Sequence, residues 1–273
     1  MPISALNGVR MFWAQRGSDG APVVFVHGSW GDHHNWDAVA GAFARTFRAF
    51  AYDRRGHSQS ERPAGQGSID EDVADLGALI RSLNLTPAHV IGNSGGAVVA
   101  LKLAAMAPDL FASLAVHEPP CVGMIQDHPV MPAVGQRLGA VTELLRGGDM
   151  EAGARAFVET IAFGPGMWET LSSGMRQTFI FNAPTFLDEM NEPLSVMAVD
   201  LEGLARFARP ILLTRGKRSA PFFGAILDRI GAVLPAARQY TFEDAGHVPH
   251  LTHPDEYVRV VAGFVATVEG SPS

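Results

Sequence analysis

Ser94 lies at the centre of a motif whose residue types could hold a nucleophile. The motif is Gly92-Asn93-Ser94-Gly95-Gly96; it follows the apolar run 88–91 and precedes a helical stretch, residues 97–106. A serine between glycines where a strand passes into a helix is the G-x-S-x-G pattern of a nucleophile elbow, in which small flanking residues let two backbones pass closely. The N–H group of Gly95, in the first turn of the helix, would point at a developing oxyanion. A glycine-rich turn in which Ser94 only caps the helix fits the same five residues.

A second motif, His27-Gly28-Ser29-Trp30-Gly31, ends the apolar, β-branched run 23–27, which we interpret as a buried strand. In this geometry the backbone N–H of Ser29, just after His-Gly, would face the serine and form a two-donor oxyanion hole with Gly95. The motif is also a glycine turn by which the chain leaves the sheet. Because the donors are backbone groups, both interpretations can hold. We further expect Trp30, and Trp168 from the middle of the chain, to contact the substrate.

His247 is the candidate base. It follows the predicted strand 238–243 within the segment Asp244-Ala245-Gly246-His247-Val248-Pro249-His250, at the edge where parallel sheets place their sites. Imidazole titrates near neutral pH, and a serine hydroxyl needs such a base beside it. The trio His247, His250 and His253 also suggests a metal site, but no fourth ligand of the usual spacing accompanies it. We therefore expect neither a metal nor a cofactor.

Together these motifs resemble those of the α/β-hydrolase fold with a helical cap. The resemblance rests on the two motifs around Ser29 and Ser94, on Tyr52-Asp53-Arg54-Arg55-Gly56-His57-Ser58 and on Ala245-Gly246-His247, which in this order span about residues 23–268. It implies Ser94 as nucleophile, His247 as base, and Ser29 and Gly95 as oxyanion donors. It also implies that Asp53 and Arg54 belong to a structural turn of the core.

The carboxylate of a catalytic triad is not at its usual place. Relatives commonly carry it after the strand that matches 210–215, whereas this chain has Gly216-Lys217-Arg218-Ser219 there. A hydroxyl cannot stabilise the imidazolium, and loss of the acid's charge costs on the order of 10⁴ in rate. Glu118, at the end of the predicted strand 112–117, is the best substitute, although it also fits a loop residue before Pro119-Pro120. Asp228, in the middle of a helix, and Asp244, close to His247 in sequence, are weaker alternatives.

The elements that must position these residues alternate between strand and helix. Apolar runs predict strands at 23–27, 47–52, 88–92, 112–117, 210–215 and 238–243, and helical spacing predicts helices at 70–83, 97–106, 222–234 and from Pro254 onward. Such alternation predicts an α/β fold with a mostly parallel, doubly wound sheet. Residues 121–205 contain no convincing strand and are rich in methionine and phenylalanine. We interpret 121–205 as an inserted helical cap, and 1–120 with 206–273 as the α/β-hydrolase core.

Composition narrows the class of protein. The chain has 273 residues, a net charge of −7 with no basic patch, and one cysteine, Cys121. We expect no nucleic-acid partner, no internal disulfide and a reducing, cytoplasmic location. The N-terminal residues lack an apolar signal segment, and no run approaches the length of a membrane span. A small-molecule substrate is the expected partner, and a homo-oligomer is compatible with the sequence.

These observations favour a serine hydrolase that cleaves an ester, lactone or thioester of a largely apolar small molecule through an acyl-enzyme. A serine at the elbow argues against enzymes of this fold that need an aspartate nucleophile, namely epoxide hydrolases and haloalkane dehalogenases. Two alternatives stay open. One is non-acyl chemistry on the same fold, by a carbon–carbon bond hydrolase, a lyase or a cofactor-free oxygenase. The other is a hydrolase-like receptor that closes its cap on a ligand.

Overall fold

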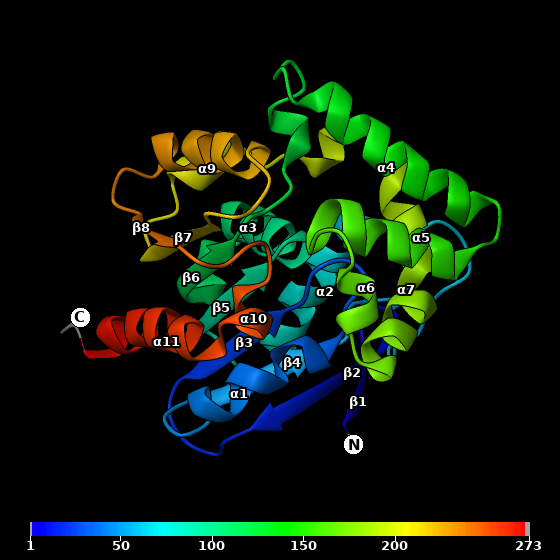
Figure 1. Ribbon diagram of the computed structural model, residues 1–273. Helices are drawn as coiled ribbons and strands as arrows, with labels where there is room; N and C mark the ends of the chain where they lie inside the picture. Colours follow the sequence, from blue (N-terminus) through cyan, green and yellow to red (C-terminus); the bar gives the residue numbers. More distant parts are fainter. Residues whose placement is uncertain (1, 271–273) are drawn as a thin grey trace.

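The computed structural model describes residues 2–270, and within that range eight strands form one sheet (Figure 1). The spatial order is β1-β2-β4-β3-β5-β6-β7-β8. Only the β1–β2 and β2–β4 pairs are antiparallel. The strands are β1 (Ile3–Leu6), β2 (Val9–Arg16), β3 (Pro22–Val26), β4 (Arg48–Tyr52), β5 (Ala88–Asn93), β6 (Phe111–His117), β7 (Ile211–Gly216) and β8 (Arg238–Phe242). The predicted mostly parallel α/β sheet is confirmed, and its reversal of strand order around β3 and β5 puts the carboxyl ends of both strands at one edge.

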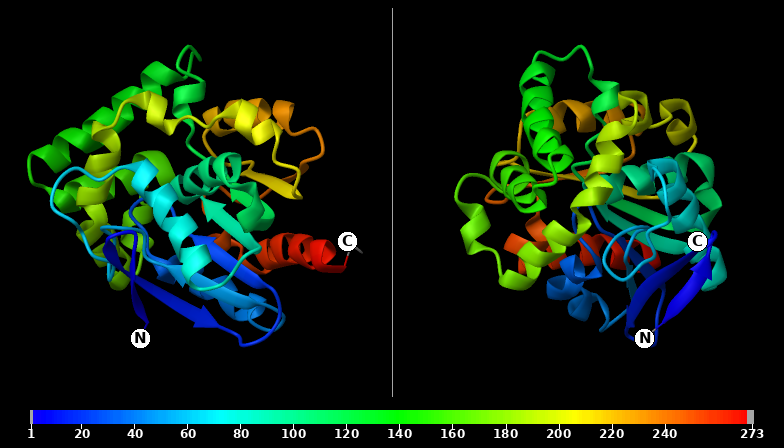
Figure 2. Two further views of the ribbon diagram at one scale, coloured as in Figure 1. Left: turned by 180° about the vertical axis from the view of Figure 1, so that it is seen from behind. Right: turned by 90° about the vertical axis from the view of Figure 1, so that its right-hand side faces the viewer.

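Both faces of the sheet are covered by helices, which explains the continuous apolar character of the central strands. Along β3, Val24 and Val26 pack in one core cluster while Val23 and Phe25 pack in the other. The first face carries α2 (Ile69–Ser82), α3 (Gly95–Met106) and α9 (Phe222–Val233). The opposite face carries α1 (Asp37–Phe43) and α11 (Pro254–Gly270), and Figure 2 shows this layering from two further sides. Among the described residues, no helix has the length and apolarity to cross a bilayer.

The first twenty residues contain structure that the sequence patterns did not predict. Strands β1 and β2 form an antiparallel pair in which Ile3 lies opposite Phe12. Strand β2 then pairs with β4, so that Trp13 lies opposite Tyr52. The burial of β2 is irregular, with exposed Arg10 beside buried Met11 and Phe12. An antiparallel strand of this kind, outside the parallel part of the sheet, lacks the continuous apolar run that identified the central strands.

Residues between β6 and β7 are helical. They form short helices η3 (Val122–Met124), η4 (Val158–Ala162) and η5 (Leu194–Met197), together with α4 (Met131–Arg146), α5 (Met150–Phe157), α6 (Met167–Thr170), α7 (Ser173–Asn191) and α8 (Leu201–Ala205). The middle of this segment has its own apolar cluster, which includes Val141, Phe157 and Phe186. The two ends, near Cys121 and Leu204, pack into the core cluster of the sheet instead. The segment is therefore anchored to the core at both ends, with α4–α7 standing over the carboxyl edge (Figure 1).

Candidate active site

Ser94 occupies a sharp turn between β5 and α3. Its backbone has φ 55° and ψ −126°, a left-handed φ that is uncommon for a residue with a side chain. The turn is held because the Ser94 N–H donates to the His117 carbonyl at 3.0 Å. A Cβ on Gly96 would lie only 2.2 Å from the carbonyl oxygen of Val26, so the helix can approach β3 only with glycine there. The elbow geometry thus explains both the strain at Ser94 and the glycine at position 96.

The backbone N–H groups of Ser29 and Gly95 both belong to residues that lie close to Ser94. A Cβ built on Gly95 would lie 3.2 Å from the Ser29 backbone nitrogen, so the two peptide groups are neighbours. Within residues 2–270, neither the Ser29 N–H nor the Gly95 N–H donates to another protein group. Free donors of this kind, at a turn and at the start of a helix, can receive an anionic oxygen.

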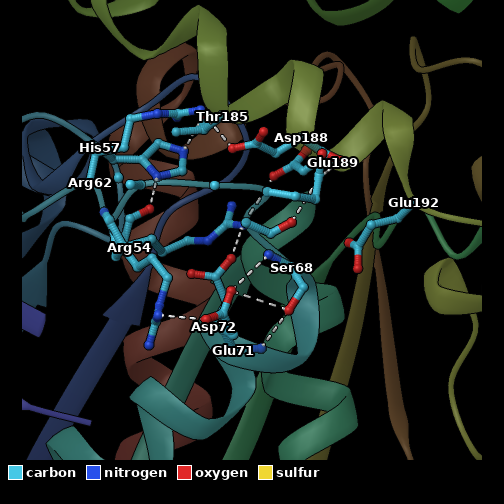
Figure 3. Close-up of a pocket in the computed structure, with 17 residues that line it drawn as sticks. Arg54, His57, Arg62, Ser68, Glu71, Asp72, Thr185, Asp188, Glu189 and Glu192 are labelled. Atoms are coloured by element: carbon cyan, nitrogen blue, oxygen red, sulfur yellow. Dashed lines mark hydrogen bonds and ion pairs between the residues drawn. The ribbon is translucent and has the colours of Figure 1, made fainter. Parts of the chain in front are cut away.

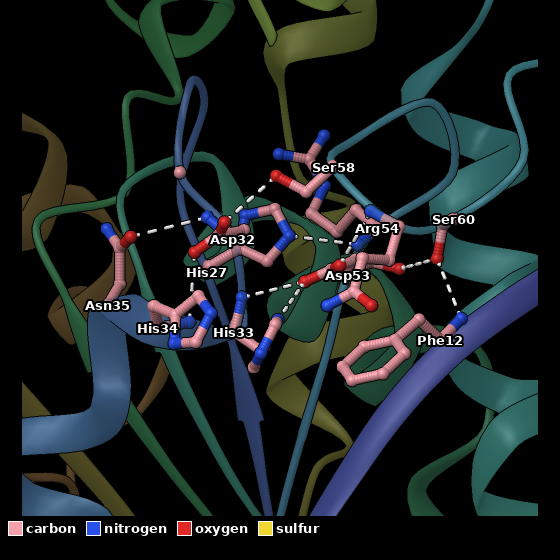
Figure 4. Close-up of polar contacts among 12 residues, drawn as sticks. Phe12, His27, Asp32, His33, His34, Asn35, Asp53, Arg54, Ser58 and Ser60 are labelled. Atoms are coloured by element: carbon pink, nitrogen blue, oxygen red, sulfur yellow. Dashed lines mark hydrogen bonds and ion pairs between the residues drawn. The ribbon is translucent and has the colours of Figure 1, made fainter. Parts of the chain in front are cut away.

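His27 fixes the loop that carries Ser29. Its Nε2 accepts the Arg54 backbone N–H at 2.8 Å, and its Nδ1 donates to the Gly28 carbonyl at 2.8 Å (Figure 4). Burial and then the charge of Arg54 lower the pKa of His27 to about 3. The ring is therefore neutral and uses one nitrogen as donor and the other as acceptor. Such a fixed tautomer holds the start of the loop against the turn at Asp53-Arg54.

Glu118 contacts His247 directly. Glu118 Oε2 lies 2.8 Å from Nδ1 of His247, and Glu118 Oε1 accepts the Gly216 N–H at 2.7 Å. His247 also stacks on Phe223 with ring centroids 4.5 Å apart, and its carbonyl accepts from Asn93 Nδ2 at 3.0 Å. A carboxylate accepts only, so Nδ1 carries the proton and Nε2 is left as the basic nitrogen. The Ser94 hydroxyl makes no hydrogen bond to any residue in the range 2–270, although Ser94 and His247 line the same cavity.

The electrostatics of Glu118 suit a partner of an imidazolium. Burial by itself would raise the pKa of this carboxyl, but the charges and hydrogen bonds of His117 and His247 outweigh burial and hold the pKa below its usual value. Glu118 is fully buried and has φ 45°, a strained backbone at the end of β6. Its charge is therefore kept in a dry position behind the ring of His247, where an opposite charge is stabilised most.

The alternative acids lie elsewhere. Asp244 is exposed and forms an ion pair with Arg218 at 2.9 Å. Asp228 is exposed on α9. Ser219, at the position where the sequence resemblance led us to expect the acid, has a buried hydroxyl without a hydrogen-bond partner among the described residues. Of these carboxylates, Glu118 is the one that contacts His247.

A cavity of about 1190 Å³, counted to its open mouth, joins the core to the cap. Ser29, Ser94 and His247 form its floor, and Glu189 of α7 reaches it from the cap. Its walls are mostly apolar side chains of α4, α5, η4, α7 and α9, including Leu138, Phe157, Ile161, Phe186, Met190, Phe222 and Phe223. Such a lining favours an apolar ligand with a few polar groups at the floor.

Trp30 and Trp168 do not line this cavity, which corrects the expectation that they contact substrate. Trp30 is fully buried, and its ring packs against Phe157 and Phe186 with centroids 4.9 Å and 4.8 Å apart. Trp168 belongs to the same cap cluster and is 2% exposed. Trp30 has φ 70°, which turns its side chain away from the floor of the cavity and into the cap. Sequence patterns gave no information on that direction.

The three histidines considered as metal ligands do not converge. His247 contacts Glu118, His250 stacks on Trp36 at 4.5 Å, and His253 contacts the Thr252 hydroxyl at 2.9 Å. Two other groups have ligand-type atoms close together: His117, Glu118 and His247, and Asp32, His33 and Asp53. Both contain short His–carboxylate hydrogen bonds, with His33 Nδ1 lying 2.6 Å from Asp53 (Figure 4). Those hydrogen bonds account for the proximity of the side chains in each group.

Three residues near the site escaped the sequence patterns: Asn93, Phe223 and Glu189. Asn93 directly precedes Ser94, so its place in the elbow motif was a usable signal for a side chain near the base. Phe223 and Glu189 had no such signal because their partners are distant in sequence; Glu189 contacts Ser29, 160 positions away.

Comparison with known proteins shows which family this chain belongs to. A model described as the alpha/beta hydrolase family matches residues 23–260, and the chain belongs to this family of hydrolases. The pimeloyl-acyl-carrier protein methyl ester esterase of Methylococcus capsulatus is 30% identical over 259 residues, covering 91% of this chain and 96% of that protein. A dihydrolipoyllysine-residue acetyltransferase component of an acetoin cleaving system from Pseudomonas putida is 36% identical over 112 residues, which is 41% of this chain and 30% of that protein.

A solved structure supports the fold independently. The enol-lactonase from Burkholderia xenovorans LB400 has a TM-score of 0.80 at 20% sequence identity, with 97% of this chain and 100% of that chain covered. At this identity the likeness concerns the fold.

Proposed function

We propose that this protein is a serine hydrolase that cleaves a carboxylic ester, lactone or thioester of a largely apolar small molecule through an acyl-enzyme on Ser94. The observation that carries the proposal is the 2.8 Å contact between Glu118 and His247 Nδ1, which leaves the other ring nitrogen as a base in the cavity that holds Ser94. The esterase from Methylococcus capsulatus, similar over nearly its whole length, supports the same class of reaction.

The proposed reaction has two halves. Ser94 Oγ attacks the substrate carbonyl carbon while Nε2 of His247 accepts the hydroxyl proton. The N–H groups of Ser29 and Gly95 stabilise the oxyanion, and Glu118 orients the ring and stabilises its positive charge. His247 then gives the proton to the leaving oxygen or sulfur. In the second half, His247 takes a proton from water, which attacks the acyl carbon, and Ser94 leaves with that proton restored.

The apolar walls of the cavity indicate the substrate class. Most of the lining side chains from the cap and from α9 are aliphatic or aromatic; the polar residues beside the reacting groups are Arg137, Thr160, Glu189 and Glu192. We therefore assign the apolar part of the substrate to the space under α4 and η4. Burial of each additional methylene there would contribute about 0.8 kcal/mol to binding.

The test is Ser94→Ala assayed on a panel of aryl and alkyl esters. Near-total loss of turnover, with the melting temperature preserved, supports the acyl-enzyme. A loss below about tenfold contradicts it and favours chemistry in which Ser94 only hydrogen-bonds to the substrate. If the unmodified protein turns over no ester but ligands of the panel raise its melting temperature, the hydrolase-like receptor is favoured instead.

A further inference from the structure

Two side chains of the cap helix α7 form hydrogen bonds with the loop that carries Ser29. Asn182 Nδ2 donates to the carbonyl groups of Trp30 at 3.1 Å and Gly31 at 2.8 Å. Seven residues, or about two helical turns, further on, Glu189 Oε2 accepts a hydrogen bond from the Ser29 hydroxyl at 2.5 Å. Helix α7 therefore contacts the loop at Ser29, at Gly31 and at the strained residue between them, Trp30, whose φ is 70°.

Glu189 is itself held by the core. Its Oε1 accepts from Arg54 Nη2 at 3.0 Å, and the same Arg54 nitrogen lies 2.5 Å from Asp72 of α2 (Figure 3). Arg54 is 1% exposed, and Glu189 is 7% exposed. Burial raises the pKa of Asp72 to about 6, against the opposing effect of Arg54. A buried ion pair of this kind loses much energy when one partner is removed, so the carboxylate of Glu189 has one fixed place.

Arg54 also contacts the start of this loop through its backbone. Its backbone N–H donates to His27 Nε2 at 2.8 Å, two residues before Ser29 (Figure 4). The Ser29 peptide thus lies between a core contact at His27 and a cap contact at Glu189. The loop that carries the Ser29 N–H, a proposed oxyanion donor, is therefore held from both the core and the cap.

We propose that Glu189 is a positioning residue: its contact with the Ser29 hydroxyl aims the Ser29 backbone N–H, so that the oxyanion hole is completed by the cap. This inference rests on the proposed function. It assigns the Ser29 side chain a role that is separate from that of its backbone. It also implies that full activity requires α7 to be packed against the loop that carries Ser29.

The test removes the contact while leaving the backbone donor in place. Ser29→Ala should lower kcat about ten- to a hundredfold with KM changed less than about twofold, since loss of a whole oxyanion donor costs about 10²–10³. The inhibition constant for a trifluoromethyl ketone, which forms a tetrahedral oxyanion on a serine, should rise by the same factor. Ser29→Thr keeps the hydroxyl and should restore most of kcat.

A double-mutant cycle separates positioning from general stability. Glu189→Ala should lower kcat as Ser29→Ala does, and the double variant should be no slower than the slower single variant. Asp188→Ala is the matched control: its neighbouring carboxylate on α7 pairs with Arg62 at 2.7 Å and does not contact the loop. Its kcat should stay within about twofold of the unmodified protein. Melting temperatures identify a variant that fails to fold, in which case Ser29→Ala alone decides.

Two results would overturn the inference. One is a Ser29→Ala variant with unchanged kcat and unchanged affinity for the trifluoromethyl ketone. The other is additivity of the two single losses. Ser94→Ala in the same assay shows whether only the inference about Glu189 is wrong or the proposed function is wrong as well. If Ser94→Ala is inactive and Ser29→Ala is fully active, only the proposed role of Glu189 is contradicted. If Ser94→Ala retains turnover, both the acyl-enzyme and the inference that rests on it are contradicted.

Discussion

Glu118 Oε2 lies 2.8 Å from His247 Nδ1, although the two residues are 129 positions apart and belong to different strand ends. Strands β6 and β7 are parallel neighbours, which brings the ends of both to one edge, and the loop after β8 supplies His247. The carboxylate is fixed on its other side by the Gly216 N–H. This arrangement offers the imidazole a buried negative charge even though Ser219 occupies the position expected for the acid.

Removing that charge is expected to disable the base. Glu118→Gln keeps an oxygen for the Gly216 N–H but cannot stabilise an imidazolium, so kcat for an aryl ester should fall about 10³–10⁴-fold. Steady-state kinetics measure the loss. Asp244→Asn is the control, because Asp244 is exposed and pairs with Arg218, and its kcat should stay within about twofold. Equal losses of kcat in the two variants would contradict the role of Glu118 as the acid that supports His247.

A carboxylate restored after β7 is expected to replace Glu118 in part. Ser219 stands at the position expected for the acid, and its buried hydroxyl has no hydrogen-bond partner among residues 2–270. Adding Ser219→Asp to Glu118→Gln should raise kcat at least tenfold over Glu118→Gln alone. The same ester assay measures the gain. No gain, in a double variant that melts at a temperature near that of Glu118→Gln, would mean that this position cannot serve His247.

The apolar cavity predicts selectivity for longer acyl chains. Each methylene buried there contributes about 0.8 kcal/mol, or about a fourfold gain in kcat/KM, until the space under the cap is filled. A series of p-nitrophenyl esters from acetate to octanoate measures this slope. Val134→Trp, on the cavity wall, should shift the optimum to shorter chains. Trp168→Phe should not shift it, because Trp168 is buried and does not line the cavity; a shift in Trp168→Phe alone would contradict the placement of the substrate.

Buried His250 predicts part of the loss of stability in acid. Burial, followed by the charges of His117 and His247, lowers its pKa well below the usual value, and both ring nitrogens lack partners within the described chain. Its folded pKa is lower than its unfolded pKa of about 6.5, so its contribution to stability is present above about pH 6.5 and is lost as pH falls. His250→Phe keeps the stacking on Trp36 and should reduce the pH slope of the unfolding free energy.

Urea unfolding at several pH values between 5 and 7 measures that slope. The variant should lose up to about 1.4 kcal/mol less per pH unit than the unmodified protein, because one fewer proton is taken up on unfolding. An unchanged slope would show that His250 is not held neutral in the folded protein.

The sequence predicts the features that depend on neighbouring residues, but not those that depend on contacts between residues far apart in the chain. The central strands, the elbow at Ser94 and the strand-end position of His247 follow from local patterns, since a buried parallel strand and a glycine-flanked turn each need particular neighbours. The pairing of β1 with β2 and the short helix α1 lacked such patterns. The direction of Trp30 could not be read, because its backbone φ and the cap that covers it are fixed by tertiary contacts. Glu189 shows the same limit, as its partner Ser29 lies 160 positions earlier.

The central claim is that Ser94 is a nucleophile, and covalent labelling tests it most directly. A fluorophosphonate should modify the folded protein once, and mass spectrometry of its peptides should place the adduct on Ser94. Saturating ester should slow the labelling, and Glu118→Gln should slow it further, since the base behind the hydroxyl is weakened. A folded protein that hydrolyses esters while Ser94 stays unmodified, or that carries the adduct on another residue, would contradict the account.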